Sequence, residues 1–264
     1  MKYIYNIDNL KNHNENTVFE EKIGKKAQNL LELAAAGFNV PHFSVITNRY
    51  FKEVILKEIE MYNQEAGNND EIKDWNAVFS GNTERKIENI IRIIKNHKIK
   101  EEFEKEIENA LNEESYYAVR SSSIEEDSSN FSFAGQFETY LYVKKENMLE
   151  KIKEVWISSF SNHVMKYRKE GKINNEINVP AVIIQEMVNS EKAGVGFSVN
   201  PVNNNYDEVV ISGTYGLGTS IVDGDENGDL FIYNKKTKEI KKEIRTKKIR
   251  QVLDFENKKI KTEE

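Results

Sequence analysis

A short apolar strand that runs into an arginine and three serines is the feature that most constrains this chain (residues 117–123, Tyr-Ala-Val-Arg-Ser-Ser-Ser). A small-residue turn around Gly135 and Gln136 follows, and a second strand begins near Thr139. Arg120 offers a planar, permanently charged fork for phosphate oxygens, and the serine hydroxyl and backbone N–H groups add neutral donors. A lone arginine in a serine-rich loop would mean little, but here strand, turn and strand signals agree. The segment therefore predicts a phosphate-binding site.

A second phosphate-directed signal lies in residues 23–30 (Ile-Gly-Lys-Lys-Ala-Gln-Asn-Leu). The apolar spacing over residues 25–36 predicts a helix that ends at Gly37. A lysine at a helix start can place its ammonium group on a phosphate, while the helix N-terminus adds partial positive charge. The chain contains no Gly-x4-Gly-Lys-Ser/Thr run, so this segment is not a Walker P-loop.

Two segments in the second half of the chain also carry candidate chemistry. Residues 182–188 (Val-Ile-Ile-Gln-Glu-Met-Val) form an apolar strand that turns polar at its end. Such a strand end suits a hinge where backbone groups read the edge of a base, although a plain core strand is the alternative. Residues 209–224 combine another apolar strand with a glycine-rich turn, and Asp223 and Asp229 lie at or just beyond its end. These carboxylates could bind a divalent cation or could equally belong to a solvated turn.

In these four segments, taken in order, the chain resembles the nucleotide-binding domain of phosphoenolpyruvate synthases, pyruvate phosphate dikinases and rifampicin phosphotransferases. The resemblance covers most of residues 20–230 and implies an α+β, ATP-grasp fold in which two lobes close on ATP. It implies a single domain over residues 1–264, with an N-terminal lobe over about 1–180, a C-terminal lobe over about 181–264 and a hinge near 185–188.

The resemblance also implies roles for individual residues. Lys26 would hold the α- and β-phosphates and Arg120 the transferred phosphate, while Lys25 stands where the family has a glycine. Adenine would be contacted at the hinge, mainly through backbone atoms. The residues expected to contact the nucleotide in the phosphate loop and at the hinge are Ser121, Gly135, Gln136, Thr139, Gln185, Glu186, Met187 and Val188.

The metal site is where the chain departs from the family. The glutamate that helps the relatives to hold magnesium is replaced here by Thr219. Because Mg²⁺ usually keeps one or two carboxylates beside phosphate oxygens and water, a nearby carboxylate would have to replace it. We expect Asp229 or Asp223 to take this role, with ATP and Mg²⁺ as the cofactors.

Hydrophobic periodicity predicts alternating helices and strands with no internal repeat. The helices are expected over residues 25–36, 50–55, 87–94, 103–111 and 148–169, the last as one long helix. The strands are expected over residues 40–47, 181–185, 194–199, 208–212 and 230–233, with a weaker signal at 249–253. Residues 63–80 are expected to be rich in loops, and the charged tail from Lys235 is expected to end the folded unit.

Composition excludes several classes of protein. A net charge of −6, with lysines scattered among acidic residues, argues against a nucleic-acid partner. The absence of cysteine excludes a disulfide framework or a thiolate metal site. Residues 1–16 lack the apolar run of a signal peptide, and no segment approaches the length of a membrane span. We therefore expect a cytoplasmic protein without nucleic-acid or membrane partners.

None of the four histidines lies in the Thr/Ser/Gly-rich context of the family's phosphocarrier histidine (His13, His42, His97 and His163). We therefore expect one module of a longer protein or of a split system, with a swivelling phosphohistidine domain and an acceptor-binding domain in cis or in trans. The expected activity is that of an ATP-dependent phosphotransferase of the pyruvate, water dikinase (phosphoenolpyruvate synthase) type. The alternatives are an antibiotic phosphotransferase of the rifampicin type and, because of Thr219, a catalytically silent nucleotide-binding or regulatory module.

Overall fold

The computed structural model describes residues 3–8, 17–65, 72, 74–123, 138–170, 177, 179–218, 221, 228–254, 257 and 259–264. The chain divides into two compact units, Met1–Met187 and Val188–Glu264. We expected the boundary near residue 180, but the strand Ala181–Glu186 pairs with a strand of the first unit on each of its sides. Its backbone hydrogen bonds therefore keep this strand in the first unit.

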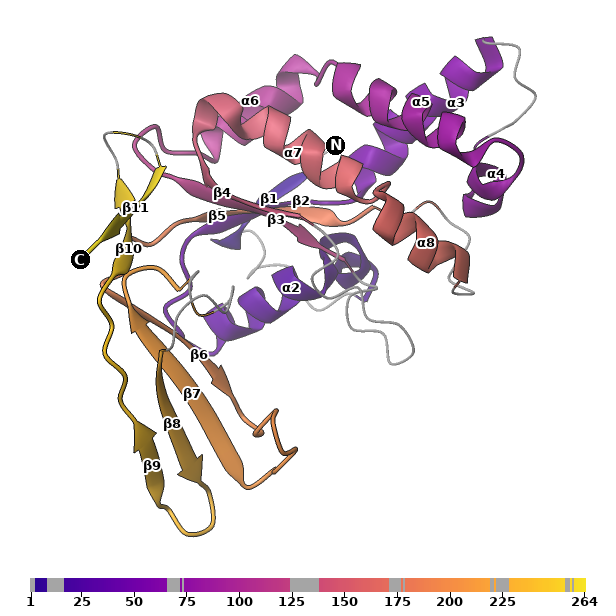
Figure 1. Ribbon diagram of the computed structural model, residues 1–264. Helices are drawn as coiled ribbons and strands as arrows, with labels where there is room; N and C mark the ends of the chain where they lie inside the picture. The colour runs from indigo at the N-terminus through magenta and orange to yellow at the C-terminus, as the bar shows by residue number, and fades with distance from the viewer. Residues whose placement is uncertain are drawn as a thin grey trace. The chain divides into compact units, whose positions relative to one another are not determined.

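The first unit is built on an antiparallel five-stranded sheet with strand order β1-β2-β5-β3-β4 (Figure 1). Its strands are β1 (Ile4–Asn6), β2 (Phe43–Ile46), β5 (Ala181–Glu186), β3 (Tyr117–Ser122) and β4 (Thr139–Val143). β5 occupies the centre of the sheet, and the first five of its residues are buried. It begins with an unbroken apolar run because helices cover both faces of the sheet.

Helix α2 (Thr17–Ala35) covers one face of this sheet. The helix is interrupted at Gly24, which has non-helical dihedral angles (φ 74°, ψ 168°). It ends as the sequence predicts, because Gly37 adopts a φ of +86° and the N–H of Phe38 donates to the carbonyl of Leu33 at 3.1 Å. The apolar contacts between helix and sheet involve Ile23, Ala27, Phe43, Val45 and Ile183.

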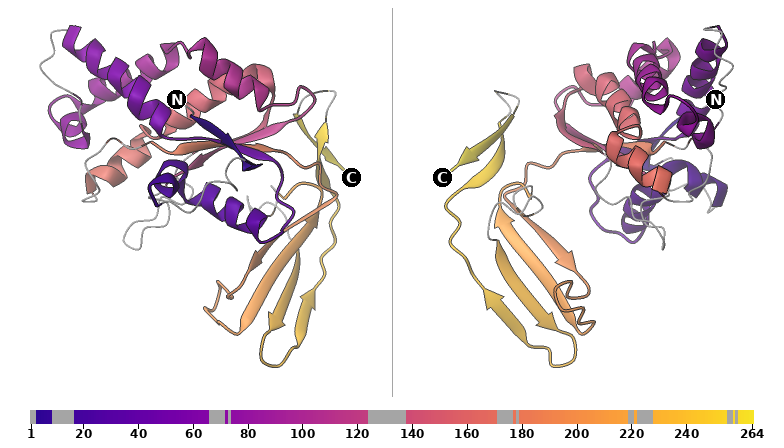
Figure 2. Two further views of the ribbon diagram at one scale, coloured as in Figure 1. Left: turned by 180° about the vertical axis from the view of Figure 1, so that it is seen from behind. Right: turned by 45° about the vertical axis from the view of Figure 1, so that its right-hand side comes forward.

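Other helices of the first unit cover the opposite face of the sheet. Figures 1 and 2 show α3, α5, α6 and α7 on the face away from α2. The predictions of helices over residues 87–94 and 103–111 are confirmed by α5 and α6. Residues 63–80, expected to be loop-rich, include the end of α3 and the short helix α4. The elements are a π-helical turn (Phe51–Ile55), α3 (Leu56–Glu65), α4 (Trp75–Phe79), α5 (Thr83–Asn96), α6 (Glu101–Asn109), α7 (Met148–Ser158) and α8 (Asn162–Glu170).

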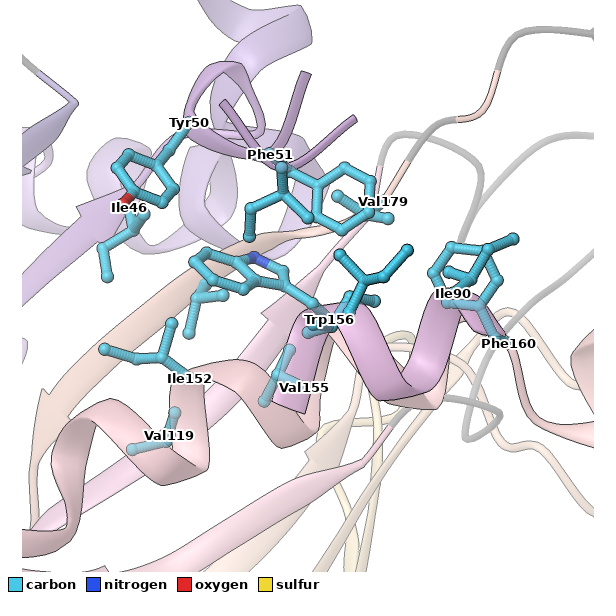
Figure 3. Packing of buried hydrophobic residues seen from close by; sticks show 14 of the residues in the cluster. Ile46, Tyr50, Phe51, Ile90, Val119, Ile152, Val155, Trp156, Phe160 and Val179 are labelled. Atoms are coloured by element: carbon cyan, nitrogen blue, oxygen red, sulfur yellow. The ribbon is translucent and has the colours of Figure 1, made fainter. Parts of the chain in front are cut away.

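Trp156 of α7 lies in the middle of the larger hydrophobic core, between the helices and the sheet (Figure 3). Its indole is fully buried and stacks on Tyr50 with a centroid distance of 5.7 Å. Phe51 meets the same indole edge-on at 6.1 Å, and Phe103 stacks on Tyr50 at 4.1 Å. Such aromatic contacts add to the free energy of burial, so this cluster anchors the helical layer on β3 and β5.

The prediction of one long helix over residues 148–169 is wrong. The helix breaks after Ser158, where successive N–H groups bond to carbonyls three residues back, ending with Ser161 to Ser158 at 3.1 Å. The Ser158 hydroxyl also donates to the carbonyl of Val155 at 2.7 Å. Serine hydroxyls compete for backbone groups in this way and favour helix ends. The break lets Phe160 enter the core, and a new helix starts at Asn162.

The second unit contains a four-stranded antiparallel meander and a separate hairpin. The meander strands confirm the predicted strands near residues 194–199, 208–212 and 230–233, and the hairpin confirms the signal at 249–253. The strands are β6 (Lys192–Phe197), β7 (Glu208–Tyr215), β8 (Asp229–Asn234), β9 (Ile240–Glu243), β10 (Arg250–Asp254) and β11 (Lys259–Glu263).

The expectation that the folded unit ends near Lys235 is also wrong. β9 pairs with β8, and the N–H of Leu217 donates to the carbonyl of Gln251 in β10 at 2.8 Å. All four residues of β9 are exposed, and two of them are lysines. Charged residues are favoured on an exposed edge strand because they prevent unwanted pairing. A strand of this kind has the composition of a solvated tail.

Helices together with antiparallel sheets confirm the α+β class that the resemblance implies. The ATP-grasp topology and the closure of two lobes stay predictions. Among the helices of the described ranges, none is both long and apolar enough to cross a lipid bilayer.

Candidate functional site

The end of β3 places Arg120 on the face of the sheet that α2 covers. Side chains alternate along a strand, and Arg120 pairs with Ile183 of β5, which packs against α2. Ser122 lies on the same face, and its hydroxyl accepts the N–H of Ala27 at 3.1 Å. On the other edge of β3, Arg120 pairs with Thr139 of the neighbouring strand β4. The predicted arginine, Thr139 and the start of α2 are therefore close neighbours in the first unit.

Gly24 brings the start of the regular part of α2 onto the end of β3. Its φ is +74°, and a Cβ at this position would lie 2.2 Å from the carbonyl oxygen of Ser122. The N–H of Lys25 donates to the carbonyl of Ser123 at 3.1 Å, next to the bond between Ala27 and Ser122. Two N–H groups of the first turn are therefore satisfied by Ser122, the last residue of β3, and by Ser123, which follows it. The positive end of the helix dipole lies at the end of this strand.

The two adjacent lysines differ in exposure. Lys25 is exposed, whereas Lys26 is half-buried in the first turn after Gly24. Together with Arg120 they place cationic side chains around a helix start, an arrangement that favours an anion such as a polyphosphate.

Arg120 contacts a second residue of the predicted site directly. Its Nη1 donates to Oε1 of Gln185 at 3.2 Å. Gln185 is 9% exposed, and it reaches Arg120 from the neighbouring strand β5. The arginine expected to bind phosphate is therefore hydrogen-bonded to the strand end expected to read the base.

Ser121, which we expected to contact the nucleotide, has its side chain on the opposite face. It pairs with Val182, which packs in the larger core beneath the helices. Its hydroxyl is fully buried and makes no hydrogen bond to any residue that the structure describes. Since alternate residues face opposite ways, only the backbone of Ser121 can reach the α2 side. Ser122 is the serine whose side chain lies on the α2 face. It could have been identified from the sequence, because alternate residues of a strand share a face and Ser122 is two residues after Arg120.

At the predicted hinge, two backbone N–H groups are already used within the first unit. The N–H of Glu186 donates to the carbonyl of His42 at 2.9 Å, and that of Met187 to the carbonyl of Tyr116 at 2.8 Å. The thioether of Met187 accepts the N–H of Tyr142 at 3.1 Å. Val188, in contrast, is 58% exposed. A base at this strand end would be read through carbonyl oxygens or through Val188.

Asp229, which the resemblance implies as a magnesium ligand, is paired with groups of the second unit. Its Oδ1 accepts the N–H of Arg245 at 2.9 Å and also forms an ion pair with Lys247. The hydrogen bond from Lys247 holds the pKa of the Asp229 carboxyl below its usual range. The Lys247 ammonium, which also lies 5.6 Å from the centre of the Tyr215 ring, already neutralises this carboxylate. Within the described residues no group of three or more His, Asp or Glu side chains is arranged to hold a metal ion.

Four of the expected site residues lie outside the described residues: Gly135, Gln136, Thr219 and Asp223. His13 does so as well. His97 is buried, and both of its ring nitrogens are engaged, one with the Glu58 carboxylate and the other with the Tyr50 hydroxyl at 3.1 Å. This network stabilises the helical layer and lies on the side of the sheet away from Arg120. His42 and His163 are exposed.

A family model described as the AMP/ATP-binding domain of pyruvate phosphate dikinase matches residues 20–264. The chain is 34% identical over 248 residues to a probable phosphoenolpyruvate synthase of Methanocaldococcus jannaschii, covering 91% of this chain and 20% of the relative. It is 33% identical over 264 residues to the phosphoenolpyruvate synthase of Pyrococcus furiosus, covering 86% of this chain and 32% of the relative.

A third relative is similar over a shorter stretch. The chain is 49% identical over 135 residues to an uncharacterised phosphotransferase, YvkC, of Bacillus subtilis, which covers 50% of this chain and 16% of the relative. The chain therefore matches between 16% and 32% of the length of these three relatives.

Proposed function

This chain belongs to the pyruvate phosphate dikinase AMP/ATP-binding domain family, and we propose that it binds ATP with magnesium and donates a phosphoryl group to a histidine on a separate domain. One observation carries the proposal more than any other. Arg120 and the start of α2 lie together on one face of the sheet, where Ser122 and Ser123 at the end of β3 accept two N–H groups from the first turn of the helix. A helix start beside an arginine and two lysines is suited to a polyphosphate.

The proposed roles follow the chain from the phosphates to the base. Lys26 holds the α- and β-phosphates, and Arg120 holds the transferred phosphate. Gly135 and Gln136 cover the phosphates, with Thr139 at their end of β4. The strand end at residues 185–188 contacts adenine. Ser122 replaces Ser121 as the serine on the nucleotide side, since its hydroxyl fixes the helix start.

The chemistry assigned to these residues is positioning and charge neutralisation. In the transfer, the phosphorus loses its bond to a bridging oxygen of ATP and gains a bond to a nitrogen of the acceptor histidine, while charge on the equatorial oxygens has to be balanced. Fixed cations and helix N–H groups supply that balance without reorganising during the reaction. Magnesium, when bound with ATP, would add its own charge at the phosphates. Of the carboxylates expected to hold it, Asp223 stays the candidate, since Asp229 is paired with Lys247.

The phosphoenolpyruvate synthases among the relatives favour pyruvate as the final acceptor. A catalytically silent nucleotide-binding module is the second candidate. It is favoured by Thr219 in place of the family glutamate and by the neutralised Asp229. The two candidates share nucleotide binding and differ in transfer.

Replacing Arg120 with alanine should weaken ATP binding by about 1.5–3 kcal/mol, because a charged hydrogen-bond donor to phosphate is lost. Isothermal titration calorimetry with a non-hydrolysable ATP analogue and Mg²⁺ measures the effect. Arg85→Ala is the matched control, since this arginine is exposed on α5 and should leave the affinity unchanged. No detectable binding by the unmodified chain at millimolar nucleotide would contradict the proposed function.

Phosphoryl transfer separates the active module from the silent one. We expect label from radioactive Mg-ATP to appear on an added phosphohistidine domain from a phosphoenolpyruvate synthase, and no phosphoenolpyruvate to form from ATP and pyruvate with this chain alone. Gel autoradiography measures the labelled domain, and a coupled assay measures phosphoenolpyruvate. As a control, the added domain must be labelled by the synthase from which it was taken. If this chain binds ATP but does not label that domain, the result would support the silent module.

A further inference from the structure

Gln185 is a buried amide at the polar end of a strand that is otherwise apolar. It is 9% exposed and lies on the α2 face of the sheet, with Ala181 and Ile183 of the same strand. Its amide oxygen accepts a hydrogen bond from Nη1 of Arg120 at 3.2 Å. The contact joins residues 65 positions apart in the chain.

The register of β3 and β5 explains how the two side chains meet. Gln185 is directly opposite Ala118, and Arg120 is directly opposite Ile183, so Gln185 and Arg120 are diagonal neighbours on one face. Long side chains can bridge this diagonal spacing. Their hydrogen bond spans this diagonal across Ala118, whose side chain is small.

The chemistry of the acceptor matters because Arg120 has to keep its charge. A neutral amide oxygen can hold a guanidinium without cancelling its positive charge, whereas a carboxylate forms an ion pair with it. Arg49 shows the contrasting case in the same unit, since its guanidinium is paired with the carboxylate of Glu53 at 2.6 Å. An arginine also has considerable rotamer entropy, and an existing hydrogen bond reduces what is lost when a ligand binds.

We propose that Gln185 is a positioning residue for Arg120: it orients the guanidinium toward the phosphates of the nucleotide and leaves its charge intact. This inference rests on the proposed function, in which Arg120 binds phosphate. It differs from the adenine contact that the resemblance implies for Gln185, because the side chain acts here at the phosphate end of the ligand. The hydrogen bond thereby couples the strand end that reads the base to the residue that binds phosphate.

A ligand without a base tests this role. Inorganic tripolyphosphate with Mg²⁺ carries the phosphate charge of ATP but neither adenine nor ribose. Gln185→Met, which keeps the length of the side chain but removes the acceptor, should weaken both Mg-ATP and Mg-tripolyphosphate about threefold to tenfold in calorimetric titrations, as expected for one lost hydrogen bond. Weakening of ATP alone, with tripolyphosphate unchanged, would show a residue that reads only adenine and would overturn the proposal.

A double-mutant cycle excludes a general effect on the fold. In the Arg120→Ala background, Gln185→Met should have no further effect on tripolyphosphate affinity, because the group it positions is absent. Additive losses would overturn the proposal. Gln185→Glu is the second variant if Gln185→Met does not fold, and it should also weaken tripolyphosphate because a carboxylate competes for the guanidinium. Failure of the unmodified chain to bind either ligand would instead overturn the proposed function itself.

Discussion

Gly24→Ala is expected to destabilise the first unit by about 3 kcal/mol or more, and to abolish nucleotide binding with it. Two effects add: a side chain at a φ of +74° is strained, and the new Cβ would lie 2.2 Å from the backbone carbonyl oxygen of Ser122. Because both clashing groups are tied to the backbone, relief requires α2 to move away from β3. Urea denaturation followed by circular dichroism measures the loss of stability.

Gly37→Ala is the matched control for this substitution. Gly37 has a similar φ of +86°, but apart from its two chain neighbours no atom of the described residues would lie within 4 Å of a Cβ there. Its replacement carries conformational strain alone, so we expect a cost of about 1 kcal/mol. Equal costs at the two glycines would contradict the close contact between α2 and β3 and, with it, the geometry of the phosphate site.

Trp156→Ala is expected to cost about 3–5 kcal/mol, the range typical of a deleted core aromatic residue. The indole is fully buried, and its loss leaves a cavity between Tyr50, Phe51 and the sheet. Phe38→Ala, at a side chain that is 65% exposed, should change stability by less than about 0.5 kcal/mol. Thermal and chemical denaturation of both variants measure the difference.

The same variant also tests whether the two faces of the sheet act separately. Trp156 packs in the core on the helical side, whereas Arg120 lies on the α2 side. Under conditions where the Trp156→Ala variant is folded, its affinity for Mg-ATP should therefore equal that of the unmodified chain. A lower affinity of the folded variant would mean that the core beneath β3 also determines the position of Arg120.

Much of the local structure could be predicted from residue patterns. The glycine that ends α2, the helices α5 and α6 and the central strand β5 all follow from periodicity and from residues that favour element ends. The two errors have different causes, local hydrogen bonds in one case and charged composition in the other. Hydrogen bonds of Ser158 and Ser161 interrupt an otherwise continuous helical pattern. The lysines of the edge strand β9 give it the charged composition that is typical of a solvated tail.

The sequence by itself determined which chemical groups are available, namely a permanently charged Arg120 and two lysines at a helix start. It also determined that the chain belongs to a family of AMP/ATP-binding domains. Only the tertiary structure decided which of those groups meet. It placed Ser122 rather than Ser121 beside α2, joined Arg120 to Gln185, and paired Asp229 with Lys247. The physical reason is that periodicity is a local property of the chain, whereas strand register and contacts between distant residues depend on how the whole unit packs.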